Sequence, residues 1–209
     1  MSRYPQRSAS VLVIIDAQQG PADELPGAAQ VLGVIAGLVA RARLGGVPVV
    51  WLRRVDADLQ VGQPAWQLAD ALASQPGEPL IDHAWDDGFT QTDLADTLAV
   101  LEAGHLWLAG LGSDAGVLHT YLGARQRGLD ATLIEDAHAG ADTEFDGCSF
   151  TAAQVAAFIN RIVWRDLAPD VTGDLVASGN VEFTAEVLDD YQIIALAEAE
   201  VARDEDSAF

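Results

Sequence analysis

The chain has 209 residues, half of them hydrophobic, which is enough for one domain with a large core. Its 11 basic residues are all arginine, and with 32 acidic residues they give a formal net charge of −21. That charge argues against a nucleic-acid backbone or an anionic membrane as a general partner, and we interpret it as a solvated surface, with a salt-adapted surface as the minor alternative.

The sequence carries no sign of a targeting or membrane segment. No long apolar stretch precedes Val11, and no later run approaches the ~20 apolar residues that span a bilayer. We therefore expect a soluble, cytoplasmic protein with no membrane partner. The single cysteine, Cys148, excludes an internal disulfide and a cysteine-based metal cluster. It lies in an acidic stretch, which disfavours a reactive thiolate, so we interpret it as a buried or incidental residue.

Short apolar runs alternate with longer helical patterns along the first two thirds of the chain. Near-continuous apolar strands are typical of a parallel sheet covered on both faces. The pattern predicts an α/β fold, a three-layer α/β/α sandwich with a mostly parallel sheet and right-handed crossovers. The expected strands are residues 11–15, 47–52, 106–109 and 131–134, and the expected helices are 28–44, 92–103 and 114–127, closed by Gly45 and Gly46, Gly104 and Gly128 as C-caps.

The last third of the chain is less regular. Thr151 is placed as the N-cap of a helix over residues 152–164 that presents an apolar stripe. Residues 180–183 are expected to form a last edge strand, and a short helix is expected from Thr184 onward. The acidic end, residues 198–209, is expected to fray. We treat residues 1–209 as a single domain.

Three polar segments follow three of the expected strands. Asp16 follows the first strand directly, Arg53 follows the second, and residues 112–116 follow the third. In open sheets of this kind a ligand lies beyond the carboxyl ends of the strands, so these segments should converge on one cleft. The third segment connects a strand to a helix that ends at Gly128, and unpaired amides at such a turn can hold an oxyanion or an anionic group.

Residues 113–117, Ser-Asp-Ala-Gly-Val, resemble the Thr-Asp-x-Cys-Val turn of the isochorismatase-like, or cysteine hydrolase, superfamily. Residues 11–18 resemble the first strand of that family with its catalytic aspartate, here Asp16. Residues 89–94 resemble its Phe-x-x-Thr-x-Leu segment, and the lysine that precedes this segment by six residues is His83 here. The resemblance covers roughly residues 10–140. Two of the three catalytic side chains, the cysteine and the lysine, are absent.

The resemblance implies a site in which glycine stands for the nucleophile. In relatives, the amides at the positions of Gly112 and Gly116 form an oxyanion hole, and a cis peptide bond precedes the first of them. The namesake branch resembles this chain in having glycine at the nucleophile position. It cleaves a vinyl ether by protonating the enol carbon and adding water. The resemblance also implies a homo-oligomer, for which we expect the interface at a sheet edge or at residues 92–103.

Asp16 is the first candidate catalytic residue. A carboxylate after an apolar strand is partly desolvated and can act as a general acid or base. Without the resemblance, a turn or capping role bonded to nearby amides would be the better interpretation. Gln18 lies on the same turn, where it is expected either to orient a ligand or to be a solvated turn residue.

His83 is the second candidate catalytic residue. Replacing a lysine with imidazole exchanges a permanent cation for a group that titrates near neutrality. His83 is expected to polarise a substrate or share a proton with Asp16. The equally good alternative is a structural role, in which His83 only packs near Trp85 with one ring nitrogen bonded to the backbone.

Further residues are candidates for binding. Arg53 would attract an anionic group, and Trp85 and Phe89 would supply aromatic walls, although both are equally suited to the core. His138 follows a strand end and is a candidate for the cleft, while His119 is expected to pack along its helix. Residues 56–58, Asp-Ala-Asp, replace the Asp-x-His element through which some relatives hold a metal, so we expect no metal and no cofactor.

Two functions from different classes remain open. The first is a hydrolase-like enzyme that acts on a small anionic metabolite by general acid/base catalysis at Asp16, without a cysteine nucleophile. The second is a catalytically inactive pseudoenzyme retained as a ligand-binding or partner-binding protein. The polar character of Asp16, Gln18, His83 and Arg53 favours the first, because a retired site tends to fill with apolar side chains.

Overall fold

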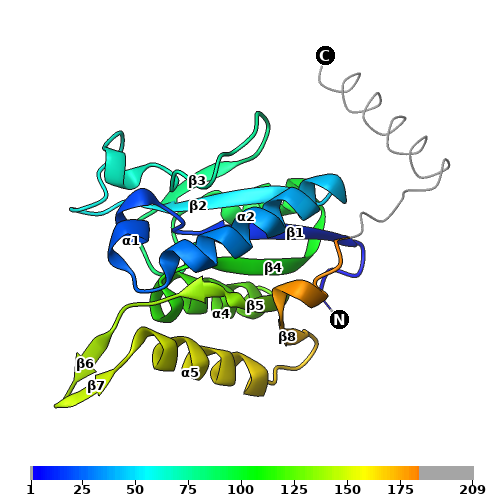
Figure 1. Ribbon diagram of the computed structural model, residues 1–209. Helices are drawn as coiled ribbons and strands as arrows, with labels where there is room; N and C mark the ends of the chain where they lie inside the picture. The colour runs from blue at the N-terminus through cyan, green and yellow to red at the C-terminus, as the bar shows by residue number, and fades with distance from the viewer. Residues whose placement is uncertain (1, 184–209) are drawn as a thin grey trace.

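The computed structural model describes residues 2–183, so the helix expected from Thr184 and the acidic end lie outside the described residues. Its centre is a six-stranded sheet in which all neighbouring strands are parallel (Figure 1). The strand order is β3-β2-β1-β4-β5-β8. The strands are β1 Ala9–Ile15, β2 Val49–Arg54, β3 Leu80–His83, β4 Ala103–Leu111, β5 Asp130–Ala139 and β8 Gly173–Val176.

Helices cover both faces of this sheet, which confirms the three-layer α/β/α fold. Side chains alternate along β1, so Leu12 and Ile14 pack in one layer and Val11, Val13 and Ile15 pack in the other. The first layer holds α2 Ala28–Leu44, and the second holds α3 Leu94–Val100, α4 Leu118–Gln126 and α5 Ala152–Arg165. Short helical segments are α1 Gln19–Glu24, η1 Pro64–Trp66, η2 Ser113–Val117 and η3 Ser178–Asn180.

The helices with strong terminal signals form where the sequence predicts them. Helix α2 spans the expected residues, and Thr151 caps α5 in a capping box with Gln154. Gly104, however, is not a C-cap. Helix α3 ends at Val100, the chain reverses through Glu102 at φ 52°, and β4 has begun by Ala103.

The expected edge strand at residues 180–183 is wrong. Residues 178–180 form η3, and the edge of the sheet is β8 instead. The sequence analysis also missed β3, at the opposite edge. Both edge strands have only 4 residues and are largely not buried, so neither carries a long apolar run.

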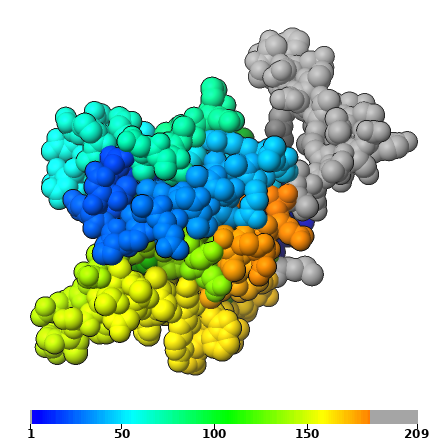
Figure 2. Space-filling view, viewed as in Figure 1, coloured from blue at the N-terminus to red at the C-terminus, as the bar shows by residue number. Residues whose placement is uncertain are grey.

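A β-hairpin connects β5 to α5. It consists of β6 Thr143–Phe145 and β7 Cys148–Phe150, joined by Asp146 and Gly147. Both turn residues have positive φ, as a two-residue Asp-Gly turn requires. The hairpin extends away from the sheet beyond the N-terminal end of α5 (Figures 1 and 2), and Cys148 is exposed on it. No helix among residues 2–183 is long and apolar enough to cross a membrane.

Candidate active site

Asp16 and His83 form a buried hydrogen-bonded pair. Asp16 follows β1, and His83 is the last residue of β3, two strands away. Asp16 Oδ1 lies 2.7 Å from His83 Nε2, with the Asp16 side chain 5% exposed and that of His83 fully buried. The Asp16 backbone has φ 52°, a left-handed conformation that is uncommon for residues other than glycine and occurs often at functional sites.

The pair holds one shared proton. His83 Nδ1 lies 2.8 Å from the Trp85 carbonyl oxygen, which only accepts, so Nδ1 carries a hydrogen. The short contact from Nε2 to Asp16 then contains one proton, in a neutral pair or an imidazolium–carboxylate pair. Burial lowers the pKa of His83, but its hydrogen bond to Asp16 and the charge of Asp16 raise the pKa above its ordinary value. This favours the imidazolium–carboxylate form.

Arg54 is the cation beside this pair. It lies opposite His83 in the register between β2 and β3. Burial lowers the pKa of Arg54, but the hydrogen bond to Asp86 and the negative charges of Asp16 and Asp86 give a net rise. Its guanidinium already pairs with Asp86 at 2.8 Å and with Asp56 at 3.2 Å, so its charge is largely matched.

Arg53 does not line the site as expected. Successive side chains on a strand point to opposite faces, so Arg53 points away from the face that Arg54 and His83 share. Its Nε donates to Asp82 at 2.9 Å, and its guanidinium carbon lies 3.8 Å from the centre of the Trp66 ring. The alternation along β2 was the signal that could have distinguished the two arginines.

Gln18 holds backbone together and does not face a ligand. It is fully buried, and its Nε2 donates to the carbonyl oxygens of Arg54 and Trp66, both at 2.9 Å. Its Oε1 accepts from the Arg54 amide at 2.7 Å. Both Nε2 hydrogens and Oε1 therefore bond to the backbone. These bonds join the turn after β1 to the end of β2 and to η1.

Gly116 lies against Asp16. A Cβ placed on Gly116 would lie 2.5 Å from Asp16 Oδ2 and 3.0 Å from Ile15 Cγ2. The position at which the superfamily carries its nucleophile therefore adjoins the carboxylate oxygen that does not contact His83. Asp16 presents Oδ1 to the imidazole and Oδ2 to this turn.

The expected cis peptide bond and the expected use of the Gly112 amide are both absent. No cis peptide bond occurs among residues 2–183, so the bond from Leu111 to Gly112 is trans. Gly112 adopts φ 77°, and its amide donates to the Ala139 carbonyl oxygen at 2.7 Å. An amide engaged in this backbone bond does not point at an oxyanion.

The aromatic candidates separate. Phe89 is 5% exposed, packs in the core and carries the Arg127 guanidinium 4.5 Å above its ring centre, so it is not a cleft wall. Trp85 is exposed, and its carbonyl oxygen contacts His83, while its indole nitrogen bonds to Gln91 at 3.3 Å.

Comparison with known proteins decides the family. The model of the isochorismatase domain matches residues 10–163. The chain belongs to the isochorismatase family. Two streptothricin hydrolases of Streptomyces noursei are 34% and 32% identical to it, over 63% and 65% of this chain and 50% and 56% of their own lengths. The chain thus spans about half the length of these relatives.

Solved structures agree with this assignment. An isochorismatase from Pseudomonas putida is 27% identical, with a TM-score of 0.76 over 83% of this chain and 90% of the other. An N-carbamoylsarcosine amidase from Thermoplasma acidophilum has a TM-score of 0.68 at 20% identity, covering 83% and 99%. The amidase therefore shares the fold of this chain.

This isochorismatase-family chain also contains a buried relay that the sequence analysis did not identify. Ser113 Oγ lies 2.8 Å from His138 Nδ1, and His138 Nε2 lies 2.8 Å from Asn160 Oδ1. Asn160 Nδ2 in turn donates to the Glu135 carbonyl oxygen at 3.0 Å, which fixes Oδ1 as the acceptor. Burial lowers the pKa of His138, so its imidazole is neutral and its Nδ1 accepts from the serine.

The relay resembles the hydrogen bonding of a serine nucleophile, yet Ser113 is fully buried. We assign it a positioning role, because it ties η2 to β5 and α5. The other candidate histidine, His119, is exposed and bonds to the Ala115 carbonyl oxygen at 2.8 Å along its helix. Among residues 2–183, no group of three or more His, Cys, Asp or Glu side chains is placed to hold a metal ion.

Proposed function

We propose that this protein is a hydrolase that acts on a small molecule through acid/base catalysis at Asp16, without a thiol nucleophile. The observation that carries the proposal is the Asp16–His83 pair at 2.7 Å, with Asp16 Oδ2 turned toward Gly116. The relatives named streptothricin hydrolase support hydrolysis as the reaction class.

His83 supplies the positive charge that the superfamily takes from lysine. The imidazolium is hydrogen-bonded to Oδ1, and Oδ2 is the atom of Asp16 that faces the turn and acts as the base. Oδ2 takes a proton from a water molecule, whose oxygen bonds to the electrophilic carbon of the substrate. The bond to the leaving group breaks, and Oδ2 returns the proton to the leaving atom. No covalent enzyme intermediate forms, because Gly116 offers no side chain.

The substrate is proposed to be small and anionic, as the sequence predicts, but the His83 imidazolium is not free to attract it, because this ring is fully buried and already pairs with Asp16. Arg53 and Arg54 contribute less than expected, because each already pairs with a carboxylate. A streptothricin is the contrasting candidate that the relatives' name supplies. Small anionic compounds and a streptothricin therefore belong in the same substrate panel.

The test is a mass-spectrometric turnover assay with isochorismate, streptothricin, small amides and enol ethers. We expect wild-type turnover of at least one compound, and a loss of about 100-fold or more in Asp16→Asn, because general acid/base catalysis contributes ~100-fold to 10,000-fold. Asp96→Asn, an exposed aspartate on α3, is the matched control and should retain full activity. Undiminished turnover in Asp16→Asn would remove Asp16 as the acid and base.

The burial of the candidate site favours a second candidate function, an inactive binding protein. Both Asp16 and His83 are almost fully buried, and the amide of Gly112 is engaged with the backbone. In that case no panel compound is turned over by the wild type. A compound that raises the melting temperature of wild type and Asp96→Asn without being converted would then identify the ligand.

A further inference from the structure

Helix α5 carries two unpaired arginines, in a chain that is otherwise strongly acidic. The helix has no acidic residue, although the chain has a net charge of −21. Arg161 and Arg165 are exposed and lie one helical turn apart, and neither contacts a carboxylate within residues 2–183. Two neighbouring guanidinium groups are therefore available to an anionic partner. Five other arginines each form an ion pair with a carboxylate, and these are Arg43, Arg53, Arg54, Arg125 and Arg127.

The two arginines line a shallow hollow together with apolar side chains. Trp164 and Leu167 complete the lining of this hollow, which has a volume of about 540 Å³. Both of these side chains are exposed. We call this surface the basic hollow. Guanidinium groups beside an indole ring and an aliphatic side chain suit a segment that carries carboxylates and some apolar side chains.

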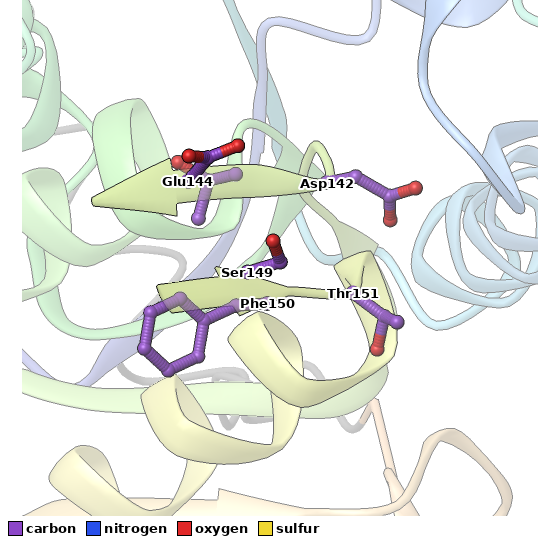
Figure 3. A pocket seen from close by; sticks show the side chains of 6 residues that line it. Asp142, Glu144, Ser149, Phe150 and Thr151 are labelled. Atoms are coloured by element: carbon purple, nitrogen blue, oxygen red, sulfur yellow. The ribbon is translucent and has the colours of Figure 1, made fainter. Parts of the chain in front are cut away.

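The hollow at the other end of α5 has the opposite character. It lies where the β6–β7 hairpin meets the N-terminal end of the helix, and its volume is about 320 Å³. Figure 3 shows the carboxylates of Asp142 and Glu144 and the ring of Phe150 at this hollow. None of the residues that line it is basic. An acidic ligand is therefore directed to the C-terminal end of α5 and away from the hairpin.

The chain itself contains an acidic segment outside the described residues. Residues 198–209 hold five acidic residues and one arginine, and three of the acidic residues are consecutive, at positions 204–206. The same segment contains Val201 and Phe209. Its composition therefore complements both the guanidinium groups and the apolar side chains of the basic hollow.

The described chain ends at the edge of the sheet where the basic hollow lies. Helices α2 and α5 each lead into a strand of the parallel sheet, so both helices end at the edge where the strands begin. Phe183 lies against Gly45, the C-cap of α2, and the basic hollow is at the C-terminal end of α5. Residues 184–197 can span up to about 50 Å. A domain of this size is roughly 40 Å across, so the acidic segment can reach the hollow.

We propose that the acidic segment, residues 198–209, binds to the basic hollow of its own chain. Its carboxylates pair with Arg161 and Arg165, and its apolar side chains cover Trp164 and Leu167. A separate acidic molecule would be repelled by the net charge of −21 before it reached the hollow. A segment of the same chain is already present at an effective concentration of roughly 1 mM, which favours it over a separate acidic partner.

The experiment places a nitroxide spin label on the acidic segment and records the indole N–H signals of the full-length chain by NMR. Ser207→Cys carries the label in a Cys148→Ser background, which removes the other thiol. The label should broaden the Trp164 indole signal, and reduction of the nitroxide should restore it. Trp85 is the internal control and should keep its intensity, because it is also exposed but follows β3 at the opposite edge of the sheet.

Charge variants of the labelled chain test whether the arginines hold the segment. Arg161→Gln/Arg165→Gln should restore most of the Trp164 signal. A salt concentration of 1 M should do the same in the chain with both arginines, because the screening length is then ~3 Å. Gln30→Glu/Gln63→Glu makes the same change in net charge at two exposed positions outside α5, and the broadening should persist. The remaining indole signals show in the same spectra whether each variant is folded.

A mixed sample identifies the chain to which the segment binds. Isotope-labelled chain without the spin label is combined with spin-labelled chain that lacks the isotope, and the Trp164 signal should keep its intensity. Broadening in this sample would overturn the proposal and assign the basic hollow to a second copy. The proposal also fails if the label on the same chain leaves the Trp164 signal unchanged, or if the broadening survives in Arg161→Gln/Arg165→Gln.

Discussion

The carboxylate of Asp16 occupies the space that a side chain on Gly116 would need, because a Cβ at Gly116 would lie 2.5 Å from Asp16 Oδ2. The absence of a side chain at Gly116 and the position of the Asp16 carboxylate therefore depend on each other. A cysteine at this position would have to displace the group proposed to carry the reaction.

Gly116→Cys should therefore destabilise the protein without creating a thiol hydrolase. We expect a loss of about 1–3 kcal/mol in the free energy of unfolding, as for overpacked core positions. Gly116→Ala is the matched variant, since it adds the Cβ without the sulfur, and should show a comparable loss. Urea denaturation measures both. Wild-type stability in both variants would mean that Asp16 has room to turn away.

The Asp16–His83 pair should stabilise the protein more at low pH than at high pH. The folded pKa of His83 is raised above its unfolded value, so its contribution is fully present below the unfolded pKa of about 6.5. That contribution is lost as the pH rises through the folded pKa. Comparing urea denaturation of wild type and His83→Gln at pH 6 and pH 9 should show the larger difference at pH 6. An equal difference at both values would argue against an imidazolium in the folded protein.

His138 should act in the opposite direction. Its folded pKa is lowered by burial, so below about pH 6.5 the unfolded chain binds a proton that the folded chain resists. This group therefore destabilises the fold as the pH falls. His138→Gln should reduce the loss of stability between pH 7 and pH 5, measured relative to wild type. A steeper loss in the variant would contradict a neutral buried imidazole.

Ser113→Ala should cost about 1–3 kcal/mol, because it leaves His138 Nδ1 buried without its donor. Ser113→Thr keeps the hydroxyl and should retain more stability. A fluorophosphonate probe should not label Ser113 in the folded protein, because the residue is fully buried. Labelling of wild type that disappears in Ser113→Ala would show instead that the relay activates a reachable nucleophile.

The sequence predicted the strands that consist of long apolar runs and the helices that have strong terminal signals. The central strands are buried on both faces, and α2 and α5 begin or end at residues with clear capping chemistry. The edge strands β3 and β8 were not predicted because they are short and largely not buried. His83 was found through resemblance to a family segment and not through recognition of its strand.

The roles of neighbouring residues at the site could not be predicted because they depend on strand register. Arg53 and Arg54 are adjacent in sequence, yet only Arg54 faces His83, and a shift of one residue would exchange them. Gln18 was expected at the surface of a turn or facing a ligand. Its burial depends on η1, which lies about fifty residues further along the chain than Gln18. No local pattern in the sequence predicts that η1 packs beside Gln18.

Gln18→Glu tests whether this buried amide holds the site together. The substitution keeps the shape of the side chain but turns a carboxylate oxygen toward the two carbonyl oxygens that Nε2 now bonds. Loss of two buried hydrogen bonds and burial of a charge should cost about 3 kcal/mol or more. Gln67→Glu, an exposed position beside η1, adds the same charge and should be nearly neutral. If substrate turnover is detected, it should fall in Gln18→Glu, because the end of β2 carries Arg54 and adjoins His83. Equal melting temperatures for the two variants would mean that solvent reaches Gln18 and that the turn after β1 is held by other contacts.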